Sequence, residues 1–500
     1  PQHIGNFTEW RDSSNAIEVQ DNYTVLILLE EPYTPFPALL ATTAASMVSP
    51  TYVQSHGGIT LGYTTSMLWL QSCGTGPYQV DEVVADDYIK LTKFEDYWNE
   101  YEIRSEYPYA GAIDKVTIKT VEFGSTRISN LNNSLSDACE WPKDEAGIVY
   151  AGLATDPSGD GTIKSLNPSL KVWADEPTYN VNGMIFNCRE FYSPQENPLQ
   201  NPFFLLGFRN AAKLSFNTSV YIEQALYGFG IQARGAIPLG MSGHNEDGTP
   251  YDIDINSAVE SWNNAMDNGL DSILANNSYE ITFLYNSGRT GREKACEILR
   301  DGIELVMANP SALQPSSPLT IQIQTIEWGT PSPYESRLNG FLNLESDFAD
   351  PSDYATYLFR NDGIIERFGG VSSISNWNAS YIDELLSEAD QSTNPEEREN
   401  LYVQIHDYAA ERNPCMWLAQ ETNFQVMSFD VNGYTFNPNT KPYFYVYWIG
   451  PLLYYSIIPN PFCIVAGVSG VVSFVGIIVL TYMIEREKKA QFIAKREQAG

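Results

Sequence analysis

The feature that most constrains this chain is an uncharged apolar run near its C-terminus, from Pro461 to Ile484. As a helix its 24 residues would span about 36 Å at about 1.5 Å per residue, enough to cross a hydrocarbon layer of about 30 Å. A buried core helix rarely runs this far without a charge, and charged residues follow at once from Glu485 to Lys489. The run therefore predicts one transmembrane helix.

The residues around this run predict the orientation of the chain. The tail, residues 485–500, carries five basic residues against three acidic ones, and a basic excess marks the cytoplasmic side. Aromatic residues typical of the outer membrane interface lie close to the run: Tyr447, Trp448, Tyr454 and Tyr455. We predict a single-pass protein of the cell membrane, extracellular up to residue 450, with an anchor at 451–484 in the lipid bilayer and a cytoplasmic tail at 485–500.

Charge and residue types exclude several functions. The formal net charge is −33, which argues against a nucleic-acid partner because binding phosphates needs a surplus of Lys and Arg. The four His residues are widely separated, and no HExxH or CxxC spacing occurs, so we predict no metal site and no cofactor. No GxSxG motif or pair of catalytic carboxylates stands out, so we predict no catalytic residues and no enzyme activity.

Two further features agree with an extracellular location. Six Asn-x-Ser/Thr sequons are candidate glycosylation sites: Asn6, Asn22, Asn132, Asn217, Asn276 and Asn378. Of six Cys residues, Cys463 falls in the membrane run and the other five would face an oxidising space. Up to two disulfides fit that number, and the spacing leaves their pairing open.

Apolar patterns in the rest of the chain alternate between strand-like and helix-like segments. Buried strands are predicted at 23–29, 88–92 and 115–120, and further strands at 280–285 and 319–326. Helices are predicted at 208–227, 292–307, 381–389 and 395–412. This order of strands and helices predicts the α/β class with parallel pairing.

Six short motifs occur in order between Ile17 and Asn437. The first is Cys73-Gly-Thr-Gly-Pro-Tyr78, where the glycines allow a tight turn and the proline fixes its exit. The others are Asn182-Gly-Met-Ile-Phe-Asn187, the stretch from Phe208 to Met241, Ile326-Glu-Trp328 with Asp347-Phe-Ala-Asp-Pro-Ser-Asp-Tyr354, and the segments beginning at Tyr381 and Glu397. Together they resemble the extracytoplasmic solute-binding proteins of ABC transporters, in the dipeptide/oligopeptide/nickel class (family 5).

The resemblance implies an α/β, two-lobe class II periplasmic-binding-protein fold, to which this chain adds one C-terminal transmembrane helix. Residues 1–178 would form lobe I, with 1–70 as a smaller subdomain, and residues 179–425 would form lobe II. Residues 426–450 would return to lobe I and form a stalk. The ligand would be enclosed at a hinge near Tyr179–Gly183 and Phe424–Asn437.

Two departures from the family pattern accompany the resemblance. Family members have roughly a hundred residues before the segment that matches 17–40, and this chain begins at Pro1 instead of Met, so we expect a processed or truncated product. Lobe I would then be reduced, or completed by a separate N-terminal fragment. The C-terminal anchor and the sequons are similar to archaeal surface members of the family.

The resemblance also implies a residue that holds the ligand. In peptide-binding relatives the first Asp of the motif that ends in Asp-Pro accepts the α-ammonium of the ligand, and that Asp corresponds to Asp347. A buried ammonium needs a carboxylate partner, because desolvation would otherwise exclude it. The following Asp350 and Asp353 are expected to serve as turn and helix-cap residues.

Five more residues are candidates for ligand contact. Trp328 resembles a pocket-lining residue of the family, although a core Trp fits the pattern nearly as well. Arg337 would face a ligand carboxylate, with a solvated ion pair as the alternative. Gly74, Thr75 and Gly76 lie near the cleft in relatives, where backbone groups pair with an extended ligand, and a structural turn is the alternative.

The leading hypothesis is an anchored receptor that captures peptides or similar oligomers and delivers them to an ABC permease. A second hypothesis is a structural component of the cell surface or an S-layer that reuses the fold. A third keeps the receptor role with an oligosaccharide ligand, because aromatic-rich clefts stack on sugars.

Overall fold

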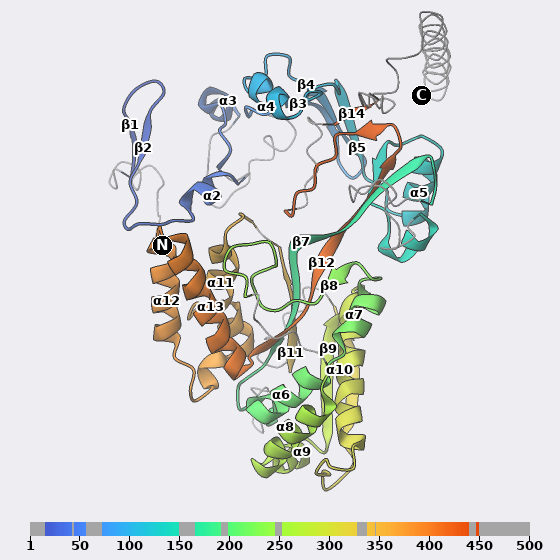
Figure 1. Cartoon of the computed structure of the whole chain (residues 1–500), viewed down its shortest axis with the longest axis vertical. Coiled ribbons are helices and arrows are strands. Elements are labelled where there is room, and N and C mark those ends of the chain that lie inside the picture. Colours follow the sequence, from blue (N-terminus) through green and yellow to red (C-terminus); the bar gives the residue numbers. More distant parts are fainter. Residues whose placement is uncertain are drawn as a thin grey trace, which may run out of the picture. The chain divides into compact units, whose positions relative to one another are not determined.

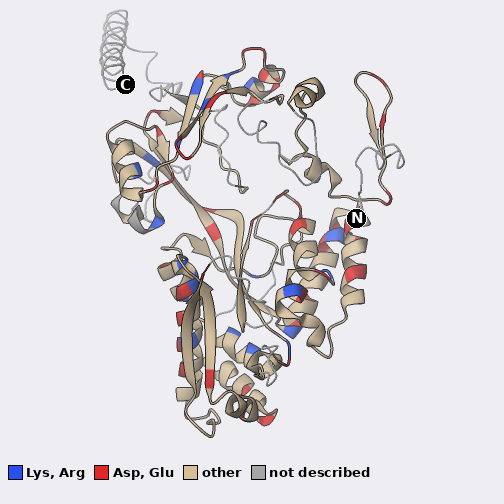
Figure 2. Cartoon of the chain, turned by 180° about the vertical axis from the view of Figure 1, so that it is seen from behind, with Lys and Arg blue, Asp and Glu red and all other residues tan. Residues whose placement is uncertain are grey.

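Two long strands, β7 (Leu170–Phe186) and β12 (Cys415–Ser428), form an antiparallel ribbon around which the protein is built (Figure 1). This computed structural model describes residues 16–42, 45–56, 73–149, 166–191, 199–245, 253–327, 338–345, 347–439 and 447–449. These residues belong to one compact unit, Pro1–Gly450. The acidic residues behind the negative charge are scattered over many elements instead of forming one patch (Figure 2).

The main sheet contains five strands, all paired antiparallel. β12 pairs with β7 along its length, from Cys415 opposite Ile185 to Ser428 opposite Leu170. β11 (Asn339–Leu344) pairs with the other edge of β7, and β6 (Ala138–Cys139) and β8 (Gly230–Ile231) pair with β12. The prediction of parallel pairing is wrong for this sheet, because the chain leaves along β7 and returns in the opposite direction along β12.

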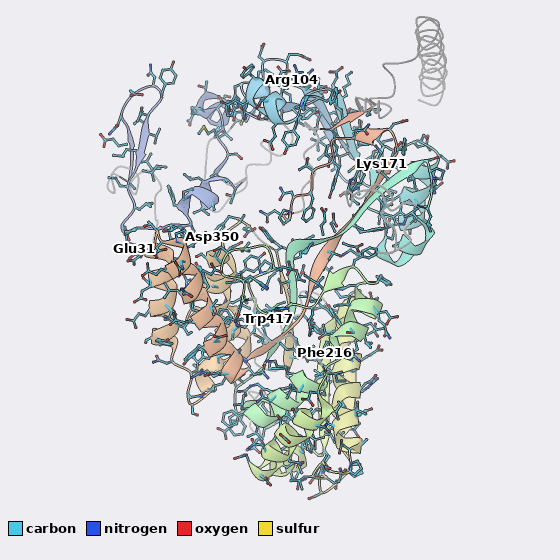
Figure 3. The ribbon with its side chains drawn as sticks, in the orientation of Figure 1. Glu31, Arg104, Lys171, Phe216, Asp350 and Trp417 are labelled. Atoms are coloured by element: carbon cyan, nitrogen blue, oxygen red, sulfur yellow. The ribbon has the colours of Figure 1, made fainter. Side chains whose placement is uncertain are left out.

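Near Phe186, alternate residues of the ribbon belong to two different cores, as the pleat of a strand requires. Met184, Phe186 and Leu418 pack into a core with the helices α6 (Leu206–Ser215), α8 (Ile255–Asp267) and α10 (Thr290–Ala308). Val181, Ile185 and Trp417 pack into a second core with α11 (Pro351–Phe359), α12 (Ala379–Gln391) and α13 (Pro395–Arg412). Figure 3 shows Trp417 and Lys171 toward opposite ends of the ribbon.

The other end of the ribbon supports two smaller cores. Val172 and Val426 pack with Trp141 and with Leu131 of α5 (Gly124–Asn132), next to the short helix η3 (Lys143–Ile148). Trp173 packs near β13 (Val431–Asn432), which pairs with β14 (Trp448–Ile449). Other elements before β7 are α2 (Phe36–Leu40), α3 (Pro50–Ser55), α4 (Glu100–Glu106) and a meander of β3 (Tyr78–Val84), β4 (Tyr88–Lys93) and β5 (Lys115–Lys119).

Several local predictions are confirmed. β9 (Glu280–Asn286), α10 and β10 (Thr320–Ile326) form a strand–helix–strand unit in which β9 and β10 pair in parallel. Helices α12 and α13 lie where they were predicted, and Asn394 caps α13 by accepting from the backbone N–H of Glu396 at 3.1 Å. The small elements after β7 are η4 (Pro202–Phe204), α9 (Leu270–Asn276), η6 (Ile365–Gly369) and η7 (Val371–Ser373).

The single helix predicted at 208–227 is wrong. The chain forms α6 up to Ser215 and a separate helix, α7 (Thr218–Ala225). The side chain of Asn217 accepts a hydrogen bond from the backbone N–H of Val220 at 3.0 Å, which starts the second helix. Both helices bury apolar residues, so the apolar spacing continues across the break between α6 and α7. The Asn217 cap is the feature that marks the break.

The predicted burial of the early strands is also wrong. β1 (Ile17–Val19) and β2 (Val25–Ile27) pair as a hairpin, yet all six of these residues are exposed. Val19 is 71% exposed and Tyr23, in the connecting turn, is 98% exposed. β4 and β5 are strands as predicted, but most of their residues lie at the surface or only partly buried. A purely local apolar pattern does not determine whether another element covers it.

Among the described residues, no helix is long and apolar enough to cross a membrane. The predicted span 461–484 lies outside the described residues. Cys73, Cys139, Cys188, Cys296 and Cys415 are free thiols, so the five form no disulfide with one another. In the described part of the chain, no group of three or more His, Cys, Asp or Glu residues is placed to hold a metal ion.

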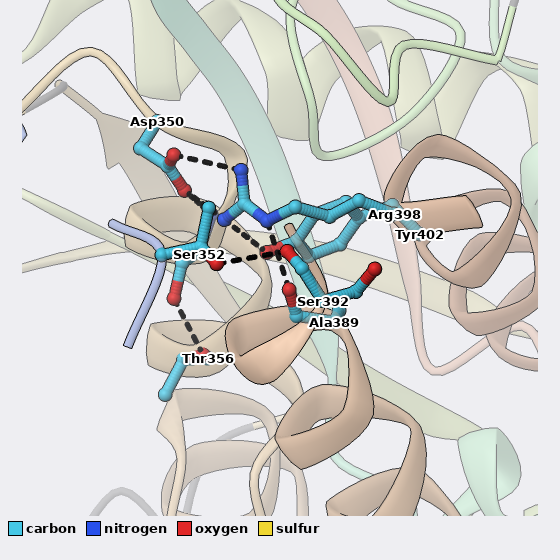
Figure 4. A network of polar contacts seen from close by, with 8 residues as sticks. Asp350, Ser352, Thr356, Ala389, Ser392, Arg398 and Tyr402 are labelled. Carbon is cyan, nitrogen blue, oxygen red and sulfur yellow. Dashed lines mark hydrogen bonds and ion pairs between the residues drawn. The ribbon is translucent and has the colours of Figure 1, made fainter. Parts of the chain in front are cut away.

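A buried ion pair joins α11 to α13 (Figure 4). Arg398 makes two hydrogen bonds to the carboxylate of Asp350, at 2.9 and 2.6 Å, and one to the hydroxyl of Tyr402 at 3.0 Å. Asp350 also accepts from the backbone N–H of Ser352 at 2.9 Å, which caps α11. The carboxylate of Asp353 accepts from the N–H of Asp347 at 2.7 Å, so the predicted turn and cap roles of Asp350 and Asp353 are confirmed.

Replacing the arginine of this pair should destabilise the protein strongly. Arg398→Met leaves the buried Asp350 carboxylate without its cation, and we expect a loss of about 3–5 kcal/mol in the free energy of unfolding. The control is Arg360→Met, which removes an exposed pair with Asp362 and should cost at most about 1 kcal/mol. Urea denaturation followed by circular dichroism measures both, and equal losses would contradict a structural role for the buried pair.

Candidate ligand-binding site

A cavity of about 210 Å³ lies beside the ribbon where β7 and β12 change register. Its walls come from β7, from β12, from the segment after β13 and from the start of η3. The lining residues are Lys143, Thr178, Asn180, Glu421, Thr422, Asn423, Phe424, Gln425, Tyr434, Thr435, Phe436 and Asn437. Most of these side chains are polar, in contrast to the apolar cores on either side.

Irregular strand pairing produces this polar lining. The register of β12 against β7 shifts between Gln420 and Thr422 and again between Thr422 and Phe424. In each shift β7 contributes extra residues, and one of them, Asp175, has a φ of 71°. Such bulges redirect side chains that a regular strand would place in a core.

Side chains replace the backbone bonds that the bulges remove. The hydroxyl of Thr178 donates to the carbonyl of Glu421 at 2.9 Å. The side chain of Asn423 accepts from the backbone N–H of Glu176 at 2.9 Å. These bonds give partners to backbone groups that the bulges leave without a ladder partner, and buried backbone groups without one would cost free energy.

The cavity contains one acid and one base, and they form a pair. The Nζ atom of Lys143 lies 2.9 Å from the carboxylate of Glu421, and the two side chains are 30% and 24% exposed. The other carboxylate oxygen of Glu421 accepts from Nδ2 of Asn182 at 3.0 Å. The charges therefore cancel inside a cavity that belongs to a strongly acidic chain.

A buried glutamine, Gln420, precedes the lining residue Glu421 on β12. Gln420 is 1% exposed; its Nε2 donates to the carbonyls of Thr178 at 2.7 Å and Leu239 at 3.1 Å. Its Oε1 accepts from the N–H of Leu239 at 2.8 Å. The hydroxyl of Tyr179 donates to the carbonyl of Gly240 at 3.1 Å. The loop around Leu239, part of one sequence motif, is thus tied to both strands of the ribbon.

A buried lysine connects β7 to β13, the strand that precedes the lining residue Tyr434. Lys171 on β7 is 2% exposed, and its Nζ donates to the carbonyl of Val431 at 2.9 Å and to Oδ1 of Asn432 at 2.6 Å. The chain continues from these residues to Tyr434, which lines the cavity. Burial lowers the pKa of Lys171 to about 8, because a dry environment disfavours the charged form.

The predicted ligand residues are not among those that line this cavity. Asp347 is exposed, in the loop before α11. Gly74 forms an isolated bridge with Val48, and the carbonyl of Thr75 accepts from Nε1 of Trp98 at 3.1 Å, next to Gly76. Trp328 and Arg337 lie outside the described residues. Ligand contact by these residues stays a prediction.

Sequence reasoning missed Lys143 and Glu421. A signal for Glu421 is present in the sequence, because Gln420-Glu-Thr-Asn423 interrupts an otherwise apolar strand. Polar residues in the middle of a buried strand need a specific environment. Lys143 carries no such signal, since 278 positions separate it from Glu421.

The described glycosylation candidates lie at or near the surface. Asn22, Asn132, Asn276 and Asn378 are exposed, Asn217 is half-buried, and Asn6 lies outside the described residues. Asn378 caps α12 through its side-chain oxygen, as Asn217 caps α7. The amide nitrogen, which would carry a glycan, is the other atom of the group, so capping and modification do not compete for the same atom.

Comparison with known proteins places the chain in a family of binding proteins. It belongs to the bacterial extracellular solute-binding proteins, family 5, whose middle-region model matches residues 2–332. The dipeptide-binding protein of Escherichia coli K12 is 24% identical over 438 residues, covering 86% of this chain and 70% of that protein. Heme-binding protein A of Haemophilus influenzae is 24% identical over 439 residues, covering 86% and 69%.

A solved structure shows the same fold. The ABC transporter-associated periplasmic binding protein DppA from Helicobacter pylori, in complex with the peptide STSA, matches with a TM-score of 0.59 at 19% identity. The match covers 90% of this chain and 78% of that one. The α/β periplasmic-binding-protein fold expected from the motifs is thereby confirmed, and the relatives are solute-binding proteins, not enzymes.

The buried lysine predicts a pH dependence of stability. The pKa of Lys171 is lowered from 10.5 to about 8 in the folded protein, so between these two pH values the unfolded chain binds more protons than the folded one. The stability of the wild type should therefore rise with pH through this window relative to Lys171→Met, by roughly 3 kcal/mol in total.

Only the pH-dependent part of that difference is diagnostic, because Lys171→Met also removes two hydrogen bonds at every pH. Chemical denaturation at a series of pH values from 7 to 11 measures it. Lys90→Met, at an exposed lysine paired with Glu82, is the control and should give no rise in the same window. A flat difference for Lys171→Met would show that the buried amine keeps its ordinary pKa.

Proposed function

We propose that this protein is a cell-surface receptor that captures short peptides, or similar oligomers, and delivers them to an ABC permease. Membership of the solute-binding family supports the receptor role. We infer a peptide ligand from the lining of the cavity, which contains Thr, Asn, Gln and Tyr side chains. These groups donate and accept hydrogen bonds as the amides of a peptide require.

The same lining weighs against other ligands. None of the lining residues is His, Cys or Met, the side chains that bind haem iron or nickel in many proteins. Phe424, Tyr434 and Phe436 offer aromatic faces to an oligosaccharide, but a neutral sugar would leave the Lys143–Glu421 pair without a role. A peptide uses both the polar and the charged groups.

Capture would proceed by closure around the ribbon. The bulged stretch of β7 and β12 is the part of the ribbon with the least regular pairing, and hinges form where a few residues absorb a change in backbone angles. Closure would remove the bound peptide from water and give the permease a distinct surface to recognise. This step rests on the family resemblance and on the position of the bulges beside the cavity.

Binding of a peptide should make the protein more compact and more stable. At a peptide concentration a hundred times Kd, the free energy of unfolding should rise by about 2.7 kcal/mol, and the radius of gyration should fall. Small-angle scattering and thermal unfolding with trialanine measure these changes, with maltose as the control ligand. A response to maltose alone would favour an oligosaccharide receptor, and no response to any peptide pool would favour a structural surface protein.

We further propose that residues 461–484 anchor the protein in the cell membrane, with the described unit outside and glycosylated. The uncharged length of this run and the basic tail support the proposal. The exposed apolar hairpin of β1 and β2 supports a further partner, a polypeptide segment that completes this part of the protein.

Removing the predicted anchor should release the protein from membranes. A chain ending at Gly450 keeps the whole compact unit that contains the cavity and should appear in the aqueous fraction after an alkaline carbonate wash. A chain ending at Ile484, which lacks only the tail, should stay in the membrane pellet. Release of both chains, or of neither, would refute the assignment of the anchor.

A further inference from the structure

Residues 31–35, which we call the strap, connect the part of the chain before β7 to the end of α12. The backbone N–H of Thr34 donates to the carbonyl of Asp390 at 2.7 Å, and the hydroxyl of Thr34 donates to the carbonyl of Ser392 at 2.8 Å. The last carbonyls of a helix have no partner within the helix itself. Thr34 therefore supplies donors to acceptors that the end of α12 leaves open.

Two more side chains of the strap lie against the same end of the helices. Nε2 of Gln391 donates to the carboxylate of Glu31 at 3.0 Å. Burial raises the pKa of the Tyr33 phenol, and the nearby Asp390 carboxylate raises it further. Figure 3 shows Glu31 and Asp350 at this end of the helices. The strap is thus held by polar contacts at several of its residues.

The strap belongs to a series of contacts that leads from one end of the ribbon to the other. Through α2 the chain continues to Val48, which forms a bridge with Gly74, just before the meander of β3, β4 and β5. Ile113, just before β5, packs against the core that contains Trp173 of β7. Helix α12 belongs to the core that contains Trp417, toward the opposite end of the ribbon. The two ends are therefore joined twice, once along the strands and once through the strap.

The connection through the strap bypasses the cavity. The cavity and the register shifts between Gln420 and Phe424 lie between the two ends of the ribbon. A rotation about this stretch changes the distance between α12 and the meander, and the strap spans that distance. The cores at either end bury many apolar side chains, whereas each hydrogen bond contributes little net stability. Opening should therefore break the contacts of the strap with α12 and leave the cores intact.

We propose that the strap is a detachable clasp, which holds the cavity closed while it is bound to α12 and is released when the cavity opens. The inference rests on the proposed peptide-binding function and adds a control over how long the peptide stays bound. The residues of the strap are not among the twelve that line the cavity, so the clasp acts on the opening of the site and not on contacts with the ligand. Because it stabilises the closed form alone, it should slow the release of the peptide.

The double variant Glu31→Ala/Thr34→Val tests the clasp, because it removes both side-chain bonds of the strap and keeps the branched shape at position 34. The control, Glu18→Ala/Thr42→Val, makes the same two changes on the exposed hairpin and at the end of α2. Surface plasmon resonance on the full chain measures the release of trialanine. Release should be roughly 10-fold faster from the strap variant than from the wild type, the effect of losing two ordinary hydrogen bonds. The control should release trialanine at the wild-type rate.

Hydrogen exchange tests the same contact without a ligand, in variants whose circular dichroism matches that of the wild type. The amide of Thr34 should be protected in the wild type, gain protection with trialanine, and lose protection in the strap variant but not in the control. An amide at position 34 that exchanges as in an unfolded chain under both conditions would overturn the clasp, as would equal release rates from the strap variant and the control. A wild type that does not bind trialanine would overturn the proposed function. The clasp would then stand or fall with the protection of Thr34 in the ligand-free protein.

Discussion

The antiparallel pairing of β7 with β12 is the constraint on which the rest of the structure depends. Four cores take residues from this one ribbon. Its pleat directs neighbouring residues, such as Met416 and Trp417, into different cores. A slip of one position would exchange the two faces and place every side chain in the wrong core. The register of the ribbon therefore determines which of its side chains pack against each group of helices.

The regular pairing of β7 with β12 is interrupted at the cavity. A fully paired apolar strand offers no polar group to a ligand, so the cavity lies where pairing shifts between Gln420 and Phe424. The cost of the interruption is offset by specific side chains. Gln420 bonds to the carbonyl of Thr178 inside the interrupted stretch, and Thr178 itself bonds to the carbonyl of Glu421. Outside that stretch, Lys171 connects the ribbon to β13, from which the chain continues to Tyr434 of the cavity lining. The same two strands therefore supply both residues of the cores and residues that line the cavity.

The sequence predicted what depends on neighbouring residues. Helices α12 and α13, the parallel unit of β9, α10 and β10, and the cap and turn roles of Asp350 and Asp353 follow from spacing and cap chemistry over a few positions. The end of α6 was missed because apolar spacing continues through Phe216 into α7.

Contacts between residues far apart in the sequence could not be predicted, because neighbouring residues carry no information about them. Antiparallel pairing of β7 with β12 joins segments on either side of more than two hundred residues, and the partner of Lys143 lies 278 positions away. The family resemblance predicts Asp347 as a ligand residue, and that stays a prediction, whereas the charged residues that line the cavity are brought together only by the fold. The predicted burial of the strand at 23–29, which contains β2, is wrong because burial depends on what covers a strand.

The separation of β7 and β12 along the chain has a consequence for synthesis. Phe186 and Cys415 are 415 − 186 = 229 positions apart. At roughly 5–20 residues per second, a ribosome needs on the order of ten to fifty seconds to reach the second strand after completing the first. During that interval the first half of β7 presents unpaired backbone to its surroundings, and open strand edges recruit other chains. Closing so long a loop also delays pairing after release. The strands that organise the folded molecule are thus the ones most in need of protection while it is being made.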